Sequence, residues 1–389
     1  MSAHSIIAMS AAGIWGKPDG CTGYPLMAQL YPELESTPEA LEGEASHEIG
    51  QGLIENCARG IRDGKPEQYI GRTASNGEVF TEEMFEGAKL YADDVDFIMR
   101  ERAVFGGPHL GVERKIIAKS IHELSFGTCD CFLFDQRTGQ LFIWDYKFGF
   151  EVVEAFENWQ AMNYCAGIFE ELHVNGLLDQ VTTVHIRIVQ PRAFHREGSI
   201  REWKVNGADL RGYFNQLRYN AHKALGPDAE FKTGPHCKHC SGRHACPAAL
   251  TAGVRLFEAA TQPVPVELSP EALGYQLTLI KRARKQLEYL ESGYEEQVDG
   301  LVKSGKVVPG WGVAPTFGHE KWIKPYKEVI AMGQMMGGHN LAKEKLKTPN
   351  EARKLGIDES VIAEYSTKPR TGLTIVPDNG NKAKQVFSQ

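Results

Sequence analysis

The chain has 389 residues, of which 42% are hydrophobic and 24% are charged, and its formal net charge at pH 7 is −7. This length excludes a peptide too short to bury a core, and it predicts two domains or one domain with a large appendage. No apolar run approaches the roughly 18 residues that span a bilayer, and the N-terminal segment lacks the basic residues of a signal peptide. We therefore expect a soluble, cytoplasmic protein with no membrane partner, in which any contact with nucleic acid needs a local basic strip.

The first part of the chain predicts two helices followed by strands. Residues 33–62 contain a Ser/Thr-Pro helix start and apolar residues at helical intervals, and residues 80–104 form a second helical stretch. Between residues 111 and 149, Ile, Phe and other strand-forming residues predict three strands, with a hairpin turn at 135–139.

The alternation of helices and strands continues further along the chain. A helix, two strands and another helix are predicted at 152–172, 181–191, 200–205 and 207–225. This order predicts a mixed α/β fold in which helices pack on a central sheet.

The composition changes after residue 247. A proline-containing linker leads into a long charged helix, and short lysine-rich helices and a loosely ordered tail follow it. We therefore divide the chain into a core domain at 1–262, a linker with the long helix at 263–303, and a small accessory region at 304–389.

The predicted hairpin carries polar residues in an apolar, aromatic context. Asp145 and Lys147 are two residues apart, so they face the same side of a strand, and Asp130 lies across the hairpin. Clustered carboxylates suit Mg²⁺ or Mn²⁺, and a neighbouring lysine can orient or help deprotonate a water and offset phosphate charge. The alternative is an ordinary surface hairpin with an incidental ion pair.

The surrounding motifs resemble the RecB-like branch of the PD-(D/E)xK nuclease superfamily. In that pattern an acid precedes a hairpin and an acid-x-lysine follows it, as in GTCD at 127–130 and WDYKFG at 144–149. Gln160 and Tyr164 match the Q-x-x-x-Y motif, which orients the site or the DNA strand, and His47 stands where the branch keeps a histidine on an early helix. The resemblance implies a restriction-endonuclease-like core, with a central mixed β-sheet flanked by helices.

The same resemblance implies roles for the individual residues. His47, Asp130 and Asp145 become metal ligands, and Lys147 supports the attacking water. Glu113, on the strand before the hairpin, is a further candidate for the site, although it also fits plain surface charge. For His47 the alternative is a satisfied, partly buried histidine.

Three of the eight cysteines form a second candidate site. Cys237, Cys240 and Cys246 have the spacing C-x2-C-x5-C and need a fourth ligand to hold a metal or cluster. In one branch of these nucleases a far-upstream cysteine completes a [4Fe–4S] cluster, and Cys21 occupies that place by resemblance. The alternative is zinc with a local histidine, and the candidates are His236, His239 and His244. The remaining cysteines are interpreted as packed thiols: Cys57, Cys129, Cys131 and Cys165.

The long charged helix carries a basic run. Lys281, Arg282, Arg284 and Lys285 either follow DNA phosphates or form a solvated face compensated by glutamates. The region beyond the helix resembles the tail of a phage-borne family of uncharacterised RecB-like proteins, which implies a setting in phage recombination or replication.

These expectations combine into a metal-dependent DNA exonuclease. It would resect double-stranded ends, with 5′ to 3′ polarity favoured, for a single-strand annealing or single-strand-binding partner. The first alternative is a catalytically inactive DNA-binding or scaffold protein of the same fold, and the second is a zinc module that serves RNA.

Overall fold

The computed structural model describes residues 5–32, 36–174, 176, 181–263, 267–317, 321–322, 326–341, 348–367 and 370–377. The chain forms two compact units, residues 1–293 and 294–389. The boundary between them falls inside the long helix α8 (Pro270–Lys303).

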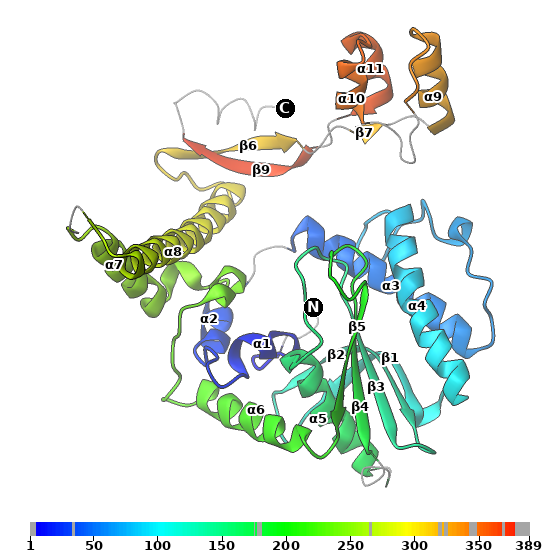
Figure 1. Cartoon of the computed structure of the whole chain (residues 1–389), viewed down its shortest axis with the longest axis vertical. Helices are drawn as coiled ribbons and strands as arrows, with labels where there is room; N and C mark the ends of the chain where they lie inside the picture. Colours follow the sequence, from blue (N-terminus) through cyan, green and yellow to red (C-terminus); the bar gives the residue numbers. More distant parts are fainter. Residues whose placement is uncertain are drawn as a thin grey trace. The chain divides into compact units, whose positions relative to one another are not determined.

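The first unit is built around one five-stranded mixed sheet (Figure 1). Its strands lie in the order of the sequence: β1 (Leu110–Ile117), β2 (Phe126–Asp135), β3 (Gln140–Tyr146), β4 (Thr183–Val189) and β5 (Ile200–Asn206). β3 and β4 are parallel and are connected through helix α5 (Trp159–Val174), whereas the other neighbouring strands are antiparallel. The predicted α/β fold with a central mixed sheet flanked by helices is confirmed.

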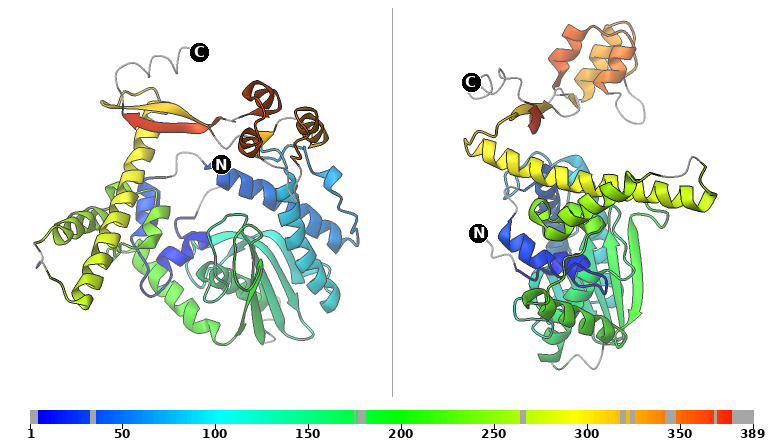
Figure 2. Two further views of the ribbon diagram at one scale, coloured as in Figure 1. Left: turned by 45° about the horizontal axis from the view of Figure 1, so that its top comes forward. Right: turned by 90° about the vertical axis from the view of Figure 1, so that its left-hand side faces the viewer.

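Helices cover both faces of this sheet, as the views in Figure 2 show. On one face, α5, α6 (Leu210–Leu225) and the short α1 (Ala12–Trp15) bury a cluster that includes Trp15, Phe132 and Ile143. On the other face, α3 (Pro38–Ala58) and α4 (Glu82–Arg102) bury a second cluster that includes Tyr91, Trp144 and Tyr146. Because both faces are covered, most of β2 and β3 is buried, and the carboxylates of Asp130, Asp135 and Asp145 within these strands are held in the protein interior.

The β2–β3 hairpin closes at the predicted turn. Thr138 Oγ1 donates a hydrogen bond to Asp135 Oδ2 at 2.8 Å, and the backbone N–H of Arg137 donates to Asp135 Oδ1 at 3.1 Å. Gly139 has a φ of +66°, a left-handed conformation that glycine adopts without a steric penalty. The turn therefore sets the register in which Cys131 of β2 faces Trp144 of β3.

Two helix boundaries differ from the prediction. The helix predicted at 152–172 begins only at Trp159, because tertiary hydrogen bonds hold the preceding loop: Gln190 Nε2 donates to the carbonyls of Gly149 and Glu151. The helix predicted at 33–62 spans Pro38–Ala58, where Thr37 Oγ1 accepts from the backbone of the first turn, and residues 33–35 of that prediction lie outside the described residues.

The last part of the first unit surrounds the cysteine segment. Helices α2 (Tyr24–Leu30), α7 (Pro247–Ala260) and α8 lie next to residues 235–246, and Met27, Cys240, Cys246, Ala249 and Leu290 form a small apolar cluster. The sequence indicated α8 but not α7.

The second unit is small and partly strand-paired. Strand β6 (Trp311–Phe317) pairs with β9 (Arg370–Pro377), and β7 (Lys321–Trp322) pairs with β8 (Ser366–Thr367). Helices α9 (Tyr326–Met335), α10 (Pro349–Lys354) and α11 (Glu359–Tyr365) enclose a core that includes Val329, Ala352 and Ile362. The prediction of a loosely ordered tail is therefore wrong over 370–377, because this segment forms a strand that pairs with β6. The rest of the predicted tail, residues 378–389, lies outside the described residues.

None of the described helices is long and apolar enough to cross a membrane.

Candidate functional site

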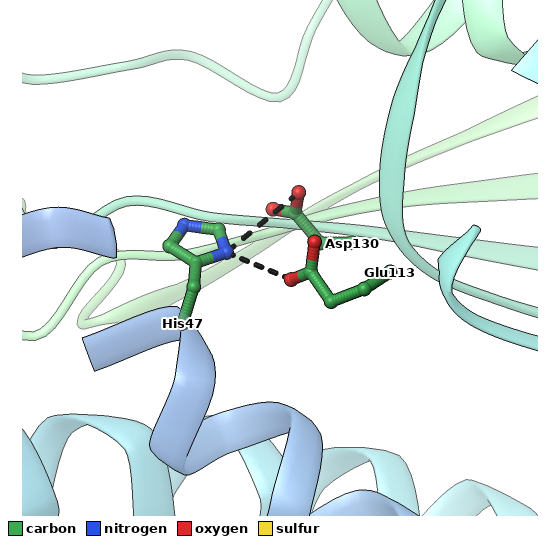
Figure 3. Close-up of side chains that lie close together, drawn as sticks. All are labelled: His47, Glu113 and Asp130. Atoms are coloured by element: carbon green, nitrogen blue, oxygen red, sulfur yellow. Dashed lines mark hydrogen bonds and ion pairs between the residues drawn. The ribbon is translucent and has the colours of Figure 1, made fainter. Parts of the chain in front are cut away.

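Three side chains from separate elements converge at one edge of the sheet (Figure 3). His47 of α3, Glu113 of β1 and Asp130 of β2 each place a ligand atom within 4.8 Å of the other two. His47 Nδ1 lies 3.0 Å from Glu113 Oε1 and 3.9 Å from Asp130 Oδ1. A nitrogen and two carboxylates at this spacing could hold one divalent cation.

The backbone orients the imidazole of His47. Its Nε2 lies 3.1 Å from the carbonyl oxygen of Tyr146, which can only accept, so Nε2 carries the proton in this contact. In the neutral ring the lone pair is then on Nδ1, which is the atom that faces Glu113 and Asp130. A histidine ligand whose other nitrogen donates to a carbonyl is the usual arrangement at metal sites.

Glu113 and Asp130 occupy a local distortion in two neighbouring strands. The Cα pairs Val112–Cys131 and Arg114–Cys129 bracket them, and Glu113 has a φ of +43°, which is rare for a residue with a side chain. Before the distortion Val112 and Cys131 face the α3–α4 cluster, whereas Cys129 beyond it belongs to the α5–α6 cluster. The distortion therefore redirects the side chains at this pair of positions, and backbone strain of this kind concentrates at functional sites.

Asp145, Lys147 and Gln160 form a second group next to the first. Lys147 Nζ donates to Asp145 Oδ1 at 2.9 Å and to Gln160 Oε1 at 3.3 Å. Gln160 Nε2 in turn donates to Asp145 Oδ1 at 2.9 Å and to the Tyr164 hydroxyl at 3.3 Å. Helix α5 thus presents both residues of the Q-x-x-x-Y motif to the end of β3.

The two groups are linked through β3. The backbone N–H of Tyr146 donates to Asp130 Oδ2 at 2.6 Å, so Asp130 is anchored beside Asp145. Asp145 is 1% exposed, and its Oδ2 has no donor in the described part of the chain. A buried carboxylate oxygen without a donor is costly, and a bound cation would satisfy it.

Burial and neighbouring charges shift the pKa values of the site residues in opposite directions. Burial raises the pKa of Asp130 and of Asp145, although Lys147 partly opposes this shift for both. Burial disfavours the charged forms of His47 and Lys147, but the carboxylates outweigh it: the pKa of Lys147 is raised, and that of His47 is raised to about 9. The carboxylates thus hold positive charge at the place where a metal ion would sit.

The structure places the seven residues singled out from the sequence in two neighbouring groups: His47, Glu113 and Asp130 in the first, and Asp145, Lys147, Gln160 and Tyr164 in the second. Asp145, which was predicted as a ligand beside His47 and Asp130, is not among the three residues whose ligand atoms lie within 4.8 Å of one another, and Glu113 is there instead. Sequence reasoning missed the contribution of Tyr146. Its carbonyl orients His47, its N–H holds Asp130, and its hydroxyl lies 2.7 Å from Ser46 Oγ on α3. No motif signals these contacts, because two of them use backbone atoms.

The four cysteines of the second candidate site also come together. Cys21, Cys237, Cys240 and Cys246 are all buried as free thiols, and they line one small pocket. The backbone N–H of Lys232 donates to Cys21 Sγ at 3.4 Å, and that of Gly234 donates to Cys237 Sγ at 3.4 Å. Burial raises the pKa of the Cys240 thiol to about 12, and the neighbouring thiols add to this shift.

A pocket of four cysteines can hold either a zinc ion or an iron–sulfur cluster. Four thiolates around one zinc ion lie about 3.8 Å apart, given a Zn–S distance of about 2.3 Å. Among the described residues, the only three ligand atoms within 4.8 Å of one another belong to the site of His47, so no three cysteine sulfurs approach this closely. In an iron–sulfur cluster each sulfur binds a different iron, so its sulfurs lie further apart, and the spacing of the free thiols is compatible with either cofactor.

The local histidines have other contacts. His236 Nε2 lies 2.9 Å from the carbonyl oxygen of Lys232, and His239 Nε2 lies 3.5 Å from a carboxylate oxygen of Glu151. His244 packs edge-on against the ring of Tyr31. In the described residues none of these histidines forms a close ligand group with the cysteines.

The chain matches the model of a protein family, described as Protein of unknown function (DUF2800), over residues 4–383. The chain belongs to the DUF2800 family. No curated protein matches the chain.

The four basic residues predicted to contact DNA on α8 of this DUF2800 chain do not all face the same side of the helix. Lys281, Arg282 and Lys285 line a groove between α7 and α8, whereas Arg284 is absent from its lining and lies 3.3 Å from Glu288. Lys285 Nζ is also paired with Glu288, at 2.7 Å. The sequence did not single out Arg255 of α7, which lines the same groove.

Proposed function

We propose that this protein is a metal-dependent DNA nuclease that hydrolyses phosphodiester bonds. The observation that carries the proposal is the convergence of His47, Glu113 and Asp130 within 4.8 Å, next to the hydrogen-bonded group of Asp145 and Lys147. The acid, acid-x-lysine pattern supports the same conclusion through its resemblance to the PD-(D/E)xK nucleases.

The first group would hold Mg²⁺ or Mn²⁺. His47 Nδ1, Glu113 and Asp130 supply nitrogen and oxygen ligands, and the Oδ2 atom of Asp145 is a buried acceptor that a cation would satisfy. Such an ion supplies Lewis-acid chemistry, in which it polarises a phosphoryl oxygen and lowers the pKa of a bound water.

Lys147 would act as a charged hydrogen-bond donor. The carboxylates of Asp145 and Asp130 raise its pKa, so it keeps its proton near neutral pH. In that form it can orient the attacking water and offset the negative charge that develops on the phosphate. Its hydrogen bonds to Asp145 and Gln160 limit its rotamers, which is the preorganisation that such a role needs.

Gln160 would hold the side chains of Asp145 and Lys147 in position. It bonds Asp145 Oδ1 through its Nε2 and Lys147 Nζ through its Oε1, and Tyr164 fixes its amide one turn further along α5. This arrangement keeps the Oδ2 atom of Asp145 directed away from Lys147 and free for another partner.

The four cysteines would hold a [4Fe–4S] cluster. Their burial and their common pocket support a bound metal centre, and the resemblance to the cluster-containing RecB-like branch favours the cluster over a single zinc ion. Its role would be structural, because it connects Cys21 near the N-terminus with residues 237–246 and closes a very long loop.

Within this function we favour an exonuclease that resects double-stranded ends in the 5′ to 3′ direction. The resemblance to RecB-like phage proteins supports this choice and a setting in phage recombination or replication, inside the host cytoplasm. A single-strand annealing or single-strand-binding protein would then receive the product.

Digestion of linear duplex DNA labelled at the 5′ or the 3′ end tests the proposal. With Mg²⁺ or Mn²⁺ we expect progressive loss of label from one end first, and no degradation in EDTA. A purified, iron-containing protein that binds the duplex without cutting it in any divalent metal would favour the alternative of an inactive scaffold. The complete set of Asp130, Asp145 and Lys147 argues against that alternative, because a degenerate site would usually have lost one of them.

A further inference from the structure

A groove between α7 and α8 concentrates positive charge on an otherwise acidic chain. It has a volume of about 1210 Å³ and is lined by α7, by α8 and by residues 231 and 233–235. Its lining includes four cationic side chains, Arg255, Lys281, Arg282 and Lys285, and no carboxylate. The formal net charge of the chain is −7, so this groove departs from the average surface.

Three of these cations are available to a ligand. Within the described residues, Arg255, Lys281 and Arg282 form no ion pair, and only Lys285 is paired, with Glu288 at 2.7 Å. Lys281 and Lys285 are four residues apart and therefore lie on the same face of α8. Unpaired cations on both walls indicate a polyanion and not a neutral ligand.

A buried polar group in the same groove is a second, independent observation. Gln286 lines the groove and is 5% exposed, and its Nε2 has no acceptor among the described residues. Buried amide donors are nearly always paired, so this one indicates a missing acceptor. Thr251 and Thr278 also line the groove and add hydroxyl groups that can bond to phosphate oxygens.

We propose that the groove between α7 and α8 binds the phosphate backbone of a single nucleic-acid strand. Arg255 contacts the backbone from one wall, and Lys281 and Arg282 contact it from the other. Tyr289 and Phe231 offer aromatic rings in the same lining on which bases can stack. The inference rests on the proposed nuclease function, since it assigns to the same compact unit a place for a strand of the substrate or product.

The test uses the full-length protein and a fluorescein-labelled oligothymidylate in EDTA, so that binding is measured by anisotropy without cleavage. Arg282→Ala is compared with Arg284→Ala, a matched change two residues away on the same helix and outside the groove. We expect Arg282→Ala to weaken binding about 3- to 10-fold and to reduce the slope of log K against log salt by about 0.7, with Arg284→Ala close to the wild type. Arg255→Ala, on the opposite wall, should behave like Arg282→Ala.

The side chain of Gln286 gives a separate readout. Gln286→Met should weaken binding while the melting temperature stays the same or rises, because the change removes an unpaired buried donor. If it lowers the melting temperature and leaves binding unchanged, Gln286 is only structural and the groove assignment is overturned.

The remaining outcomes separate the two proposals. Equal binding by the Arg282→Ala and Arg284→Ala proteins, in a chain that still degrades DNA with Mn²⁺, overturns the groove and leaves the nuclease intact. A chain that neither binds nor cuts DNA overturns both. An oligoglutamate peptide that displaces the strand more effectively than an unlabelled oligonucleotide of equal charge overturns the assignment to nucleic acid in favour of an acidic protein segment.

Discussion

The acidic site and the cysteine pocket both join distant parts of the chain, but they are held together in different ways. At the acidic site opposite charges contact one another, as in the 3.0 Å pair of His47 and Glu113 and the 2.9 Å pair of Lys147 and Asp145. At the cysteine pocket, neutral thiols lie among apolar side chains and make weak hydrogen bonds with the backbone, such as those that the N–H groups of Lys232 and Gly234 donate to sulfur. The first site is therefore assembled by contacts between its own side chains, whereas the second would depend on the proposed cluster.

Loss of a ligand residue should therefore have different consequences at the two sites. Removing an acidic ligand should abolish chemistry and leave the sheet intact, because the two apolar clusters that hold the strands lie on either side of the site. Removing a cysteine should release the N-terminal segment from residues 237–246 and weaken the fold.

The largest effect is expected at the acidic site. Asp145→Asn and Lys147→Met should each lower the rate of duplex DNA degradation by about a thousandfold or more, since each removes a charge that contacts the reacting groups. The measurement is the initial rate with Mn²⁺, alongside the melting temperature, which should change little.

The matched control for this first prediction is Asp93→Asn, on the exposed side of α4. Asp93 is exposed and forms a surface ion pair with Lys89 at 2.6 Å, so it is not part of the buried site. Its loss should leave the rate of DNA degradation unchanged. Equal rates for Asp145→Asn and Asp93→Asn would remove the acidic site from the mechanism.

The next effect is expected at the cysteine pocket. Cys240→Ser should lower the iron content and the absorbance near 400 nm of anaerobically purified protein, a band that comes from general cluster chemistry, and it should lower the melting temperature. Cys57→Ser, on α3 and outside the pocket, serves as the control. Zinc at one equivalent in place of iron would contradict the cluster and restore the zinc alternative.

A moderate effect is expected for Glu113, which the hairpin motif does not include. Glu113→Gln should weaken Mn²⁺ binding roughly 10- to 100-fold, measured by calorimetry without DNA, because it removes one charged ligand next to His47. Glu123→Gln, an exposed position in the turn between β1 and β2, should bind as the wild type does. If the Glu113 variant bound Mn²⁺ with unchanged affinity, Glu113 would not be a metal ligand and would only position His47.

The smallest effect is expected at the hairpin turn, which shares β2 and β3 with the acidic site. Asp135→Ala should cost roughly 1–3 kcal/mol of unfolding free energy at neutral pH through lost hydrogen bonds to Thr138 and Arg137, with little loss of activity per folded molecule. Burial opposes the charged form of Asp135, but these hydrogen bonds outweigh it and lower its pKa below the ordinary value of 3.8.

The sign of the pH dependence follows from that lowered pKa. The stabilisation by Asp135 is fully present above pH 3.8 and is lost as the pH falls through the folded-state pKa. Denaturant unfolding of the wild type and the variant should therefore converge in strong acid. A difference in stability that grows towards low pH would contradict this account.

Local patterns were sufficient for most of the sheet and for part of the site. Apolar runs and the Asp135–Gly139 turn predicted the β2–β3 hairpin, and the two-residue period placed Asp145 and Lys147 on one side. The helical period likewise placed Gln160 within 3.3 Å of the Tyr164 hydroxyl. These features depend on neighbours in the chain, so the sequence carries them directly.

Other features depended on contacts that no local pattern encodes. The start of α5 was misplaced because Gln190 and Arg201, more than 35 residues away, bind the preceding loop through its carbonyls. Pairing of β9 with β6 ordered a segment whose composition is typical of a loose tail. Arg255 joined the groove only because α7, a helix without a distinctive sequence signal, packs beside α8.

Sequence patterns alone were enough to name the candidate side chains of both sites and their order along the chain. The tertiary structure was needed to show that Glu113 turns towards His47 through a left-handed backbone, that the Oδ2 atom of Asp145 is buried with no donor among the described residues, and that Cys21 shares a pocket with Cys237, Cys240 and Cys246. The physical reason is range: periodicity and turn chemistry act over a few residues, whereas ligand geometry is set by packing between segments that lie tens to hundreds of residues apart.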